Sequence, residues 1–244
     1  MIVHSSCRAV CLLATWAAIV PMMTQAQDQD KRDTQRQTAA EMMQKAHATR
    51  AEWRQFPGFS ADLVVFAGTQ RTKGQLNVSK EGEVELQLSA DDSLSWVNDD
   101  LQSLVDHRLP SGDREYDVSF DDVDVTGMGR QIRFNDDSMH SVYRIRHNVI
   151  TEVHRTMGPK KLLISVMDVK RNREKKHLPR TYSVSWIDVK SGRLLSTETV
   201  NNQWVRIGDL DLPSRVLKVV HDEDGSRDVL DLRLSNHKLH TPAG

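Results

Sequence analysis

Cysteine is almost absent from this sequence of 244 residues, and its two copies, Cys7 and Cys11, both lie close to the N-terminus. No disulfide can form along the remaining chain, so a fold held by cross-links is excluded and a hydrophobic core must stabilise the domain. Neither cysteine follows an apolar run that ends in small residues, as bacterial lipid attachment requires. We therefore expect no lipid anchor.

A surplus of charge of one sign is lacking too. The chain has 33 basic and 34 acidic residues, which gives a formal net charge of -1. General binding of nucleic acid depends on a basic surface that neutralises phosphates. Nucleic acid is therefore not an expected partner.

Long apolar runs are limited to residues 9–20, which follow Arg8 and precede Thr24, Gln25 and Ala26. The run is shorter than the roughly twenty residues that cross a bilayer, so an uncleaved membrane anchor is the less favoured alternative. Basic, apolar and small-residue zones in this order are typical of a secretory signal peptide. We expect residues 1–26 to be removed after Ala26, and the mature protein to be periplasmic or extracellular with no membrane span.

The rest of the chain divides into a short leader, one domain and a tail. Residues 27–37 contain almost no apolar residue and predict a flexible polar leader. Residues 38–240 predict a single domain, followed by a tail at 241–244. Within the domain, helical spacing of apolar residues predicts one helix at about 39–55, ended by Pro57 and Gly58, and a second at 93–109.

Alternation of apolar and polar residues predicts strands almost everywhere else. Three strands between Phe59 and Leu88 form an antiparallel meander with one apolar face, and turn sequences such as "SGD", "KSG" and "EDG" separate the later strands. We place those at about 115–125, 130–135, 141–146, 149–157, 161–169, 181–190, 194–207, 213–221 and 228–240. The fold class is α+β and mainly antiparallel β: a large curved sheet or half-barrel, with the N-terminal helix and the second helix covering the concave face.

Catalytic and cofactor motifs are missing from the sequence. It has no Gly-x-Ser-x-Gly elbow and no phosphate-binding glycine fingerprint, and the spacing of His140, His147 and His154 is unlike that of zinc sites. We therefore expect no catalytic residue, no bound metal and no cofactor, and a non-enzymatic protein. An enzyme built on Asp, Glu or His groups from several strands is a third, less favoured hypothesis, because such sites assemble through space.

The most informative feature is the apolar face that the first strands share with the second helix. An apolar concavity can be a complete functional site, because each methylene removed from water contributes about 0.8 kcal/mol. The predicted hydrophobic-ligand cavity is lined by Phe59, Leu63, Val65, Leu76, Val78, Val84, Leu86, Trp96, Val97, Leu101 and Leu104.

One strongly basic stretch, "KRNREKKHLPR" at 170–180, offers a second candidate surface. Clustered cations attract anionic lipid headgroups and acidic partners, although such stretches are more often solvated loops. The possible anionic contact comprises Lys170, Arg171, Arg173, Lys175 and Lys176.

Two resemblances add to this interpretation. The segment "AHATRAEWRQFPGFSADLVVFAGTQRTKGQLNVSKEGEVELQL" and the later "RIRHNVITEVHRTM", "LPRTYSVSWIDVKSGRLL" and "DLDLPSRVLKVV" resemble an uncharacterised family described in cyanobacteria and plants. More loosely, the plan is similar to that of the LolA- and LolB-like lipoprotein carriers. That resemblance implies a half-barrel that holds acyl chains.

Two functional hypotheses follow. The first is an exported, non-enzymatic domain that binds or carries a lipid or another hydrophobic small molecule in the curved sheet. The second is a structural or protein-interaction module of the cell envelope, with no ligand, whose concave face is core.

Overall fold

The computed structural model describes residues 37–89, 94–110, 112, 114–121 and 128–241. The predicted signal peptide with its cleavage site at Ala26, most of the predicted leader, and the end of the tail lie outside these ranges. Residues 39–244 form one compact unit, which contains every helix and strand described.

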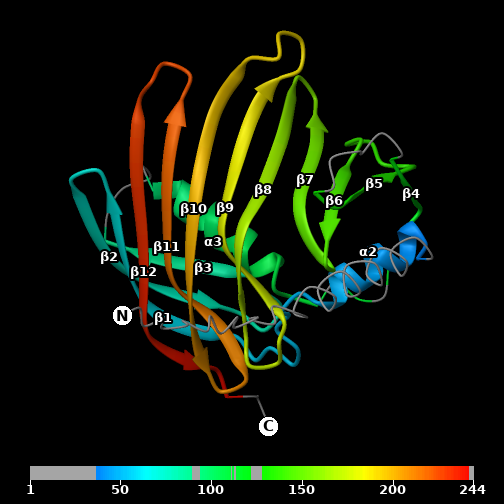
Figure 1. Ribbon diagram of the computed structural model, residues 1–244. Helices are drawn as coiled ribbons and strands as arrows, with labels where there is room; N and C mark the ends of the chain where they lie inside the picture. The colour runs from blue at the N-terminus through cyan, green and yellow to red at the C-terminus, as the bar shows by residue number, and fades with distance from the viewer. Residues whose placement is uncertain (1–36, 90–93, 111, 113, 122–127, 242–244) are drawn as a thin grey trace, which may run out of the picture. The chain divides into compact units, whose positions relative to one another are not determined.

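The described residues of this unit form two helices and twelve strands, whose arrangement Figure 1 shows. The helices are α2 (Ala39–Ala48) and α3 (Ser95–Asp106). The strands are β1 (Phe59–Ala67), β2 (Gln70–Val78), β3 (Val84–Leu88), β4 (Val118–Phe120), β5 (Arg130–Phe134), β6 (Val142–Arg146), β7 (Val149–Met157), β8 (Lys160–Arg171), β9 (His177–Asp188), β10 (Leu194–Ile207), β11 (Leu210–Asp222) and β12 (Arg227–Leu239).

All twelve strands belong to one antiparallel sheet in the order β3-β2-β1-β12-β11-β10-β9-β8-β7-β6-β5-β4. Consecutive strands that are joined by a hairpin lie next to each other in the sheet. The last strand, β12, pairs with the first strand, β1. The sheet is open and curved (Figure 1). The predicted fold class, a curved antiparallel sheet with two helices, is confirmed.

The strand register shows which side chains share a face, because directly paired residues point to the same side of a sheet. Val65 pairs with Leu232, which pairs with Val216, and both partners are buried. A second row crosses the sheet on the same side, since Glu198, Val200 and Asn202 alternate along β10. That row contains Ile132, Tyr143, Val153, Ile164, Val184, Glu198 and Val220. We call this side the inner face.

The two helices cover different parts of the inner face. Val97, Leu101 and Val105 of α3 are at most 1% exposed and pack in one cluster with residues of β1, β2 and β10–β12. Ala39, Met42, Met43 and Ala46 of α2 pack in a second cluster with residues of β5 and β6. Burying such side chains contributes about 1.5–3 kcal/mol each for the larger ones, so each helix holds its own end of the sheet.

The first helix is shorter than the sequence predicts: it ends at Ala48, and residues 49–55 are not helical. Thr49 and Ala51 instead exchange backbone hydrogen bonds with His177 at the start of β9 (Ala51 N to His177 O, 2.9 Å; His177 N to Thr49 O, 2.8 Å). The prediction of a helix to residue 55 was wrong because this pairing replaces the next helical hydrogen bonds. The second helix also begins and ends inside the predicted 93–109.

A cluster of aromatic side chains fixes the corner before β1. Trp53 stacks on Phe56 with ring centroids 4.8 Å apart, and its indole nitrogen donates to Asp211 O at 2.9 Å. Phe59 lies edge-on to Trp53 at 6.1 Å. Gly58 has φ +86°, and a Cβ there would lie 2.6 Å from Val78 O, so only glycine fits this turn.

Candidate functional site

Part of the inner face lies between the two helices and belongs to neither core cluster. We call it the open strip: five apolar side chains on β8 and β9 that are all partly exposed, namely Leu162, Ile164, Val166, Val184 and Trp186. Their register proves that they share a face, because Leu162 pairs with Trp186, Ile164 with Val184, and Val166 with Tyr182.

Packed side chains border the open strip on both sides. Val153 of β7, which pairs with Ile164, packs against the cluster under α2. Tyr182, which pairs with Val200, packs against the cluster under α3. Neighbouring strands are about 4.8 Å apart and residues rise about 3.3 Å, so the strip extends about 13 Å along β8, from Leu162 to Val166. An apolar floor of this size, flanked by two helices, suits a hydrophobic small molecule.

The predicted cavity residues lie beside the strip, beneath and on α3. Seven of them are fully buried in the cluster that α3 covers: Phe59, Leu63, Val65, Leu76, Val78, Val97 and Leu101. The other four, Val84, Leu86, Trp96 and Leu104, are partly buried against the same cluster. The structure thus brings all eleven together, with their side chains packed on one another.

A buried ion group ties α3 to the sheet where the covered region meets the open part of the inner face. Lys218 Nζ of β11 lies 2.7 Å from Asp100 Oδ2 of α3 and 3.7 Å from Glu198 Oε2 of β10, and 5.4 Å from the Trp96 ring centre. Gln102 holds the other edge of the helix, since its Nε2 donates to Gly82 O at 3.0 Å. Both contacts orient α3 on the sheet.

Burial alters the titration of two groups near this ion group. It raises the pKa of Glu198, against the opposing effect of Lys218. It also raises the pKa of Tyr182 to about 12, and the neighbouring charge of Asp100 adds to that rise. Tyr182 is therefore a neutral phenol at physiological pH, and this side of the strip carries no exposed net charge from it.

The basic stretch at 170–180 is a hairpin rather than a long solvated loop. Lys170 and Arg171 end β8, residues from His177 onward begin β9, and only a tight turn joins the strands. Lys176 donates from Nζ to Ala48 O, and Lys170 from Nζ to Trp204 O at 3.4 Å. Arg171, Arg173 and Lys175 are exposed. Of the five cations predicted to contact an anion, two thus serve contacts within the fold.

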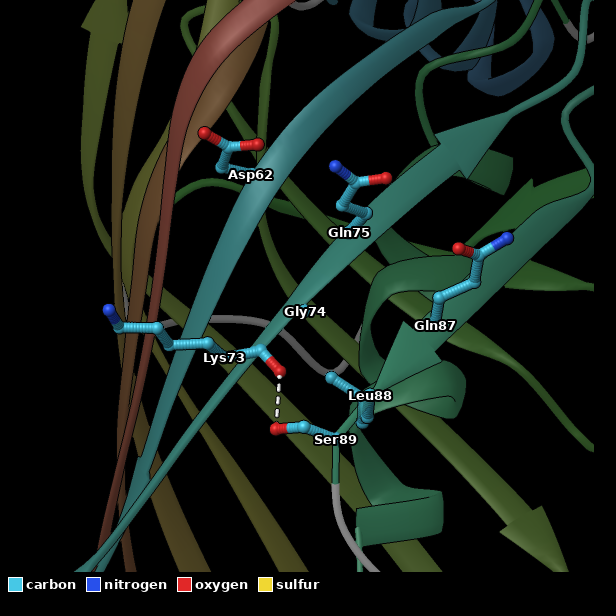
Figure 2. Close-up of a pocket in the computed structure, with 7 residues that line it drawn as sticks. All are labelled: Asp62, Lys73, Gly74, Gln75, Gln87, Leu88 and Ser89. Atoms are coloured by element: carbon cyan, nitrogen blue, oxygen red, sulfur yellow. Dashed lines mark hydrogen bonds between the residues drawn. The ribbon is translucent and has the colours of Figure 1, made fainter.

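A shallow depression lies over β1–β3 (Figure 2). Asp62, Lys73, Gly74, Gln75, Gln87, Leu88 and Ser89 line it. It has a volume of about 600 Å³ and is widely open. Asp62, Lys73 and Gln75 alternate with the buried residues of their strands, so the depression faces away from α3. Because it is open to solvent, it does not enclose a hydrophobic ligand.

Within the part of the chain that the structure describes, no three His, Cys, Asp or Glu side chains gather as a metal site would require. Nor does any helix in those ranges have the length and apolar character needed to cross a membrane.

Comparison with protein families settles the first resemblance. Residues 34–240 match the model of a protein family of unknown function, DUF3386. The chain belongs to this family. The match covers the domain from its first helix to its last strand, which confirms the resemblance to an uncharacterised family. A comparison with curated proteins finds no significant match.

Solved structures provide the second comparison. The chain is similar to a LolA superfamily protein from Nitrosomonas europaea, with 18% identity and a TM-score of 0.37, over 84% of this chain and 94% of that one. It is similar to a putative outer membrane lipoprotein-sorting protein domain from Vibrio parahaemolyticus, with 8% identity and a TM-score of 0.28, over 84% and 93%. A DUF1329 family protein from Desulfovibrio piger gives 6% identity and a TM-score of 0.30, over 84% and 93%. The predicted similarity to LolA-like proteins is thus found.

Sequence reasoning missed the open strip, although its alternation is visible in "LLISV" and "YSVSW". The signal that could have found it is the number of helices. Two helices of 10 and 12 residues are too few to cover one face of twelve strands, so some apolar positions on that face must stay uncovered.

Proposed function

We propose that this protein is an exported, non-enzymatic domain that binds a hydrophobic ligand, such as a lipid acyl chain, on the open strip between α2 and α3. The observation that carries the proposal is the set of partly exposed apolar side chains on the inner face: Leu162, Ile164, Val166, Val184 and Trp186. Export rests on the predicted signal peptide with cleavage after Ala26.

The energetics favour a ligand at this place. About six methylenes laid over the strip contribute roughly 5 kcal/mol before the entropy of binding is subtracted. The residues of the predicted cavity, such as Leu63 and Val97, form the packed wall next to the strip. A longer chain gains more contact if α3 shifts and exposes them, and Trp96 and Leu104, which are partly exposed, are the first it meets.

Tryptophan fluorescence gives the test. Brominated fatty acids quench a tryptophan that they touch, and Trp186 lies in the strip while Trp53 is only 2% exposed. We expect the acid to quench part of the emission of the protein, and this part to vanish in Trp186→Phe. The matched control is Trp53→Phe, because the Trp53 indole stacks on Phe56 at the corner before β1, and it should keep the quenching.

Native mass spectrometry with lipid extraction is the complementary measurement. A protein that carries no lipid and shows no quenching by the brominated acid supports the alternative, a structural or protein-interaction module of the cell envelope without a ligand.

A further inference from the structure

Three arginines gather at the margin of the open strip. Arg50 follows α2, Arg108 follows α3, and Arg155 lies on β7. Arg155 pairs with Leu162, which pairs with Trp186, so it stands in a row of the strip itself. We call these three residues the arginine cluster.

Hydrogen bonds and electrostatics place all three cations near the segment that follows α3. Arg50 Nη2 donates to His107 O at 2.6 Å, and Arg108 Nη1 donates to Ala51 O at 3.0 Å, so the two segments hold each other. Burial first, and then the charges of Arg50, Arg108 and Arg155, lower the pKa of His107. His107 therefore stays neutral at physiological pH, and the local positive charge comes from the arginines.

This positive charge has no matching carboxylate in contact. Among the described residues, no Asp or Glu lies within ion-pair distance of the arginine cluster, and Glu52 acts only from a longer range on Arg50 and Arg108. Arg108 is 5% exposed, and burial followed by Arg50 lowers its pKa to about 9, so it remains a cation at neutral pH. Buried cations without a counter-charge are costly, and an anionic ligand offsets that cost.

Arg155 has the donor that points to a ligand. Its Nη2 donates to Tyr143 Oη at 2.6 Å, whereas its Nε is buried and meets no acceptor among the described residues. Arg50 and Arg108 each already use one guanidinium nitrogen on a backbone carbonyl. One open buried donor with two flanking cations matches a small monoanion, because a carboxylate accepts from an arginine in its own plane.

We infer that the ligand is a long-chain carboxylate, with its chain on the open strip and its headgroup on Arg155, flanked by Arg50 and Arg108. This inference rests on the proposed function and adds the chemical class of the ligand to it. Such a ligand accounts for the position of the arginine cluster, which has no carboxylate partner among the described residues and lies next to the apolar strip.

The experiment compares ligands that differ only in the headgroup. Affinities of the full chain for a brominated fatty acid and for the brominated alcohol of equal chain length are measured by quenching of Trp186. We expect the acid to bind about tenfold tighter or more, since a hydrogen bond to a charged group is worth that factor. Added salt should weaken binding of the acid alone.

Variants then assign the headgroup contact. Arg155→Met, which keeps the apolar stem, should lose the preference for the acid and retain affinity for the alcohol. Arg155→Lys should fold with its charge in place and show an intermediate preference. Arg193→Met is the matched control, because Arg193 is exposed and pairs with Glu223 at 3.0 Å, far along the chain from the cluster.

The outcomes separate this inference from the proposed function. Equal affinity for acid and alcohol in the wild type, or equal weakening of both by Arg155→Met, overturns the headgroup assignment while leaving the strip as a binding site. Displacement of the acid by millimolar inorganic phosphate overturns the assignment to a carboxylate. Absence of binding by either ligand overturns the proposed function, and the inference with it.

Discussion

Two parts of the inner face share one sequence pattern and differ in what covers them. Beneath α3, Phe59, Ala61 and Leu63 alternate with Ser60 and Asp62 and are at most 4% exposed. On β9, Val184 and Trp186 alternate with Ser183 and Ser185 in the same way but remain partly exposed. Alternation therefore identifies an apolar face, and only the position of the helices decides whether that face is core or surface.

The charges follow the same division. At the covered part, Lys218 contacts two carboxylates, Asp100 and Glu198, so the cation between α3 and the sheet has counter-charges beside it. On the side towards α2, the arginine cluster has no carboxylate in contact among the described residues. At the margin near α3, the cation is thus paired with carboxylates of the protein itself. At the margin near α2, the cations are left for an anionic amphiphile to bind.

The largest effect is expected from the covered part. Leu63→Ala should lower the free energy of unfolding by about 2–5 kcal/mol, because it removes buried methyl groups and leaves a cavity under α3. Urea denaturation measures the change. A loss of less than about 1 kcal/mol would mean that the space under α3 is loosely filled, and that the covered part resembles the strip.

Acidification should lower the free energy of unfolding by roughly 2–3 kcal/mol through His47, which lies near the arginine cluster. Burial, followed by Arg50 and Arg114, lowers the pKa of His47 from 6.5 to about 4. Because the folded pKa is the lower one, its contribution to stability is complete above pH 6.5 and is lost as the pH falls towards 4. His47→Gln should reduce this decline, with Lys45→Gln on the same helix as control. An unchanged decline contradicts a cationic, buried environment here.

An intermediate effect is expected at the ion group. Lys218→Met keeps the length of the side chain but leaves Asp100 and Glu198 without their cation, so stability should fall by about 2 kcal/mol at neutral pH. The loss should shrink in mild acid, because burial raises the pKa of Glu198 and its carboxylate becomes neutral as the pH falls. Lys238→Met on β12, an exposed position, is the control. Equal small losses in both variants would show that the ion group does not hold α3.

The smallest effect on stability is expected from the open strip. Ile164→Ala should lower the free energy of unfolding by about 1 kcal/mol or less, because the side chain is already partly exposed. Its effect on ligand affinity should be larger than that of Leu63→Ala in the folded protein. If Ile164→Ala is as destabilising as Leu63→Ala, the strip is core and not a binding surface.

Strands were predictable from the sequence because their signals are local. The predicted 149–157 and 194–207 have the observed bounds of β7 and β10, and turn residues mark most hairpins. The end of α2 was not predictable, since its cause is pairing of Thr49 and Ala51 with His177, which is distant in the sequence. Two contacts of the basic stretch were not predictable for a related reason: Lys170 and Lys176 donate to backbone carbonyls that only the folded chain brings near.

The sequence could predict that the candidate site is apolar, but it could not predict which strands carry it. An apolar inner face followed from the alternation of Phe59, Leu63 and Val65, which the sequence shows. Which stretch of that face stays open depends on where α3 docks, and that depends in part on Lys218, which is far from the helix in the chain. The arginine cluster joins three separate segments, so no spacing in the sequence indicates it.

The most direct test of a ligand site on the open strip is anomalous diffraction from crystals of the protein with a brominated fatty acid. Bromine peaks should lie over Ile164 and Val184, with the carboxylate end towards Arg155. Peaks between α3 and β1, beside Leu63 and Val97, or no ordered bromine at saturating ligand, would contradict this account.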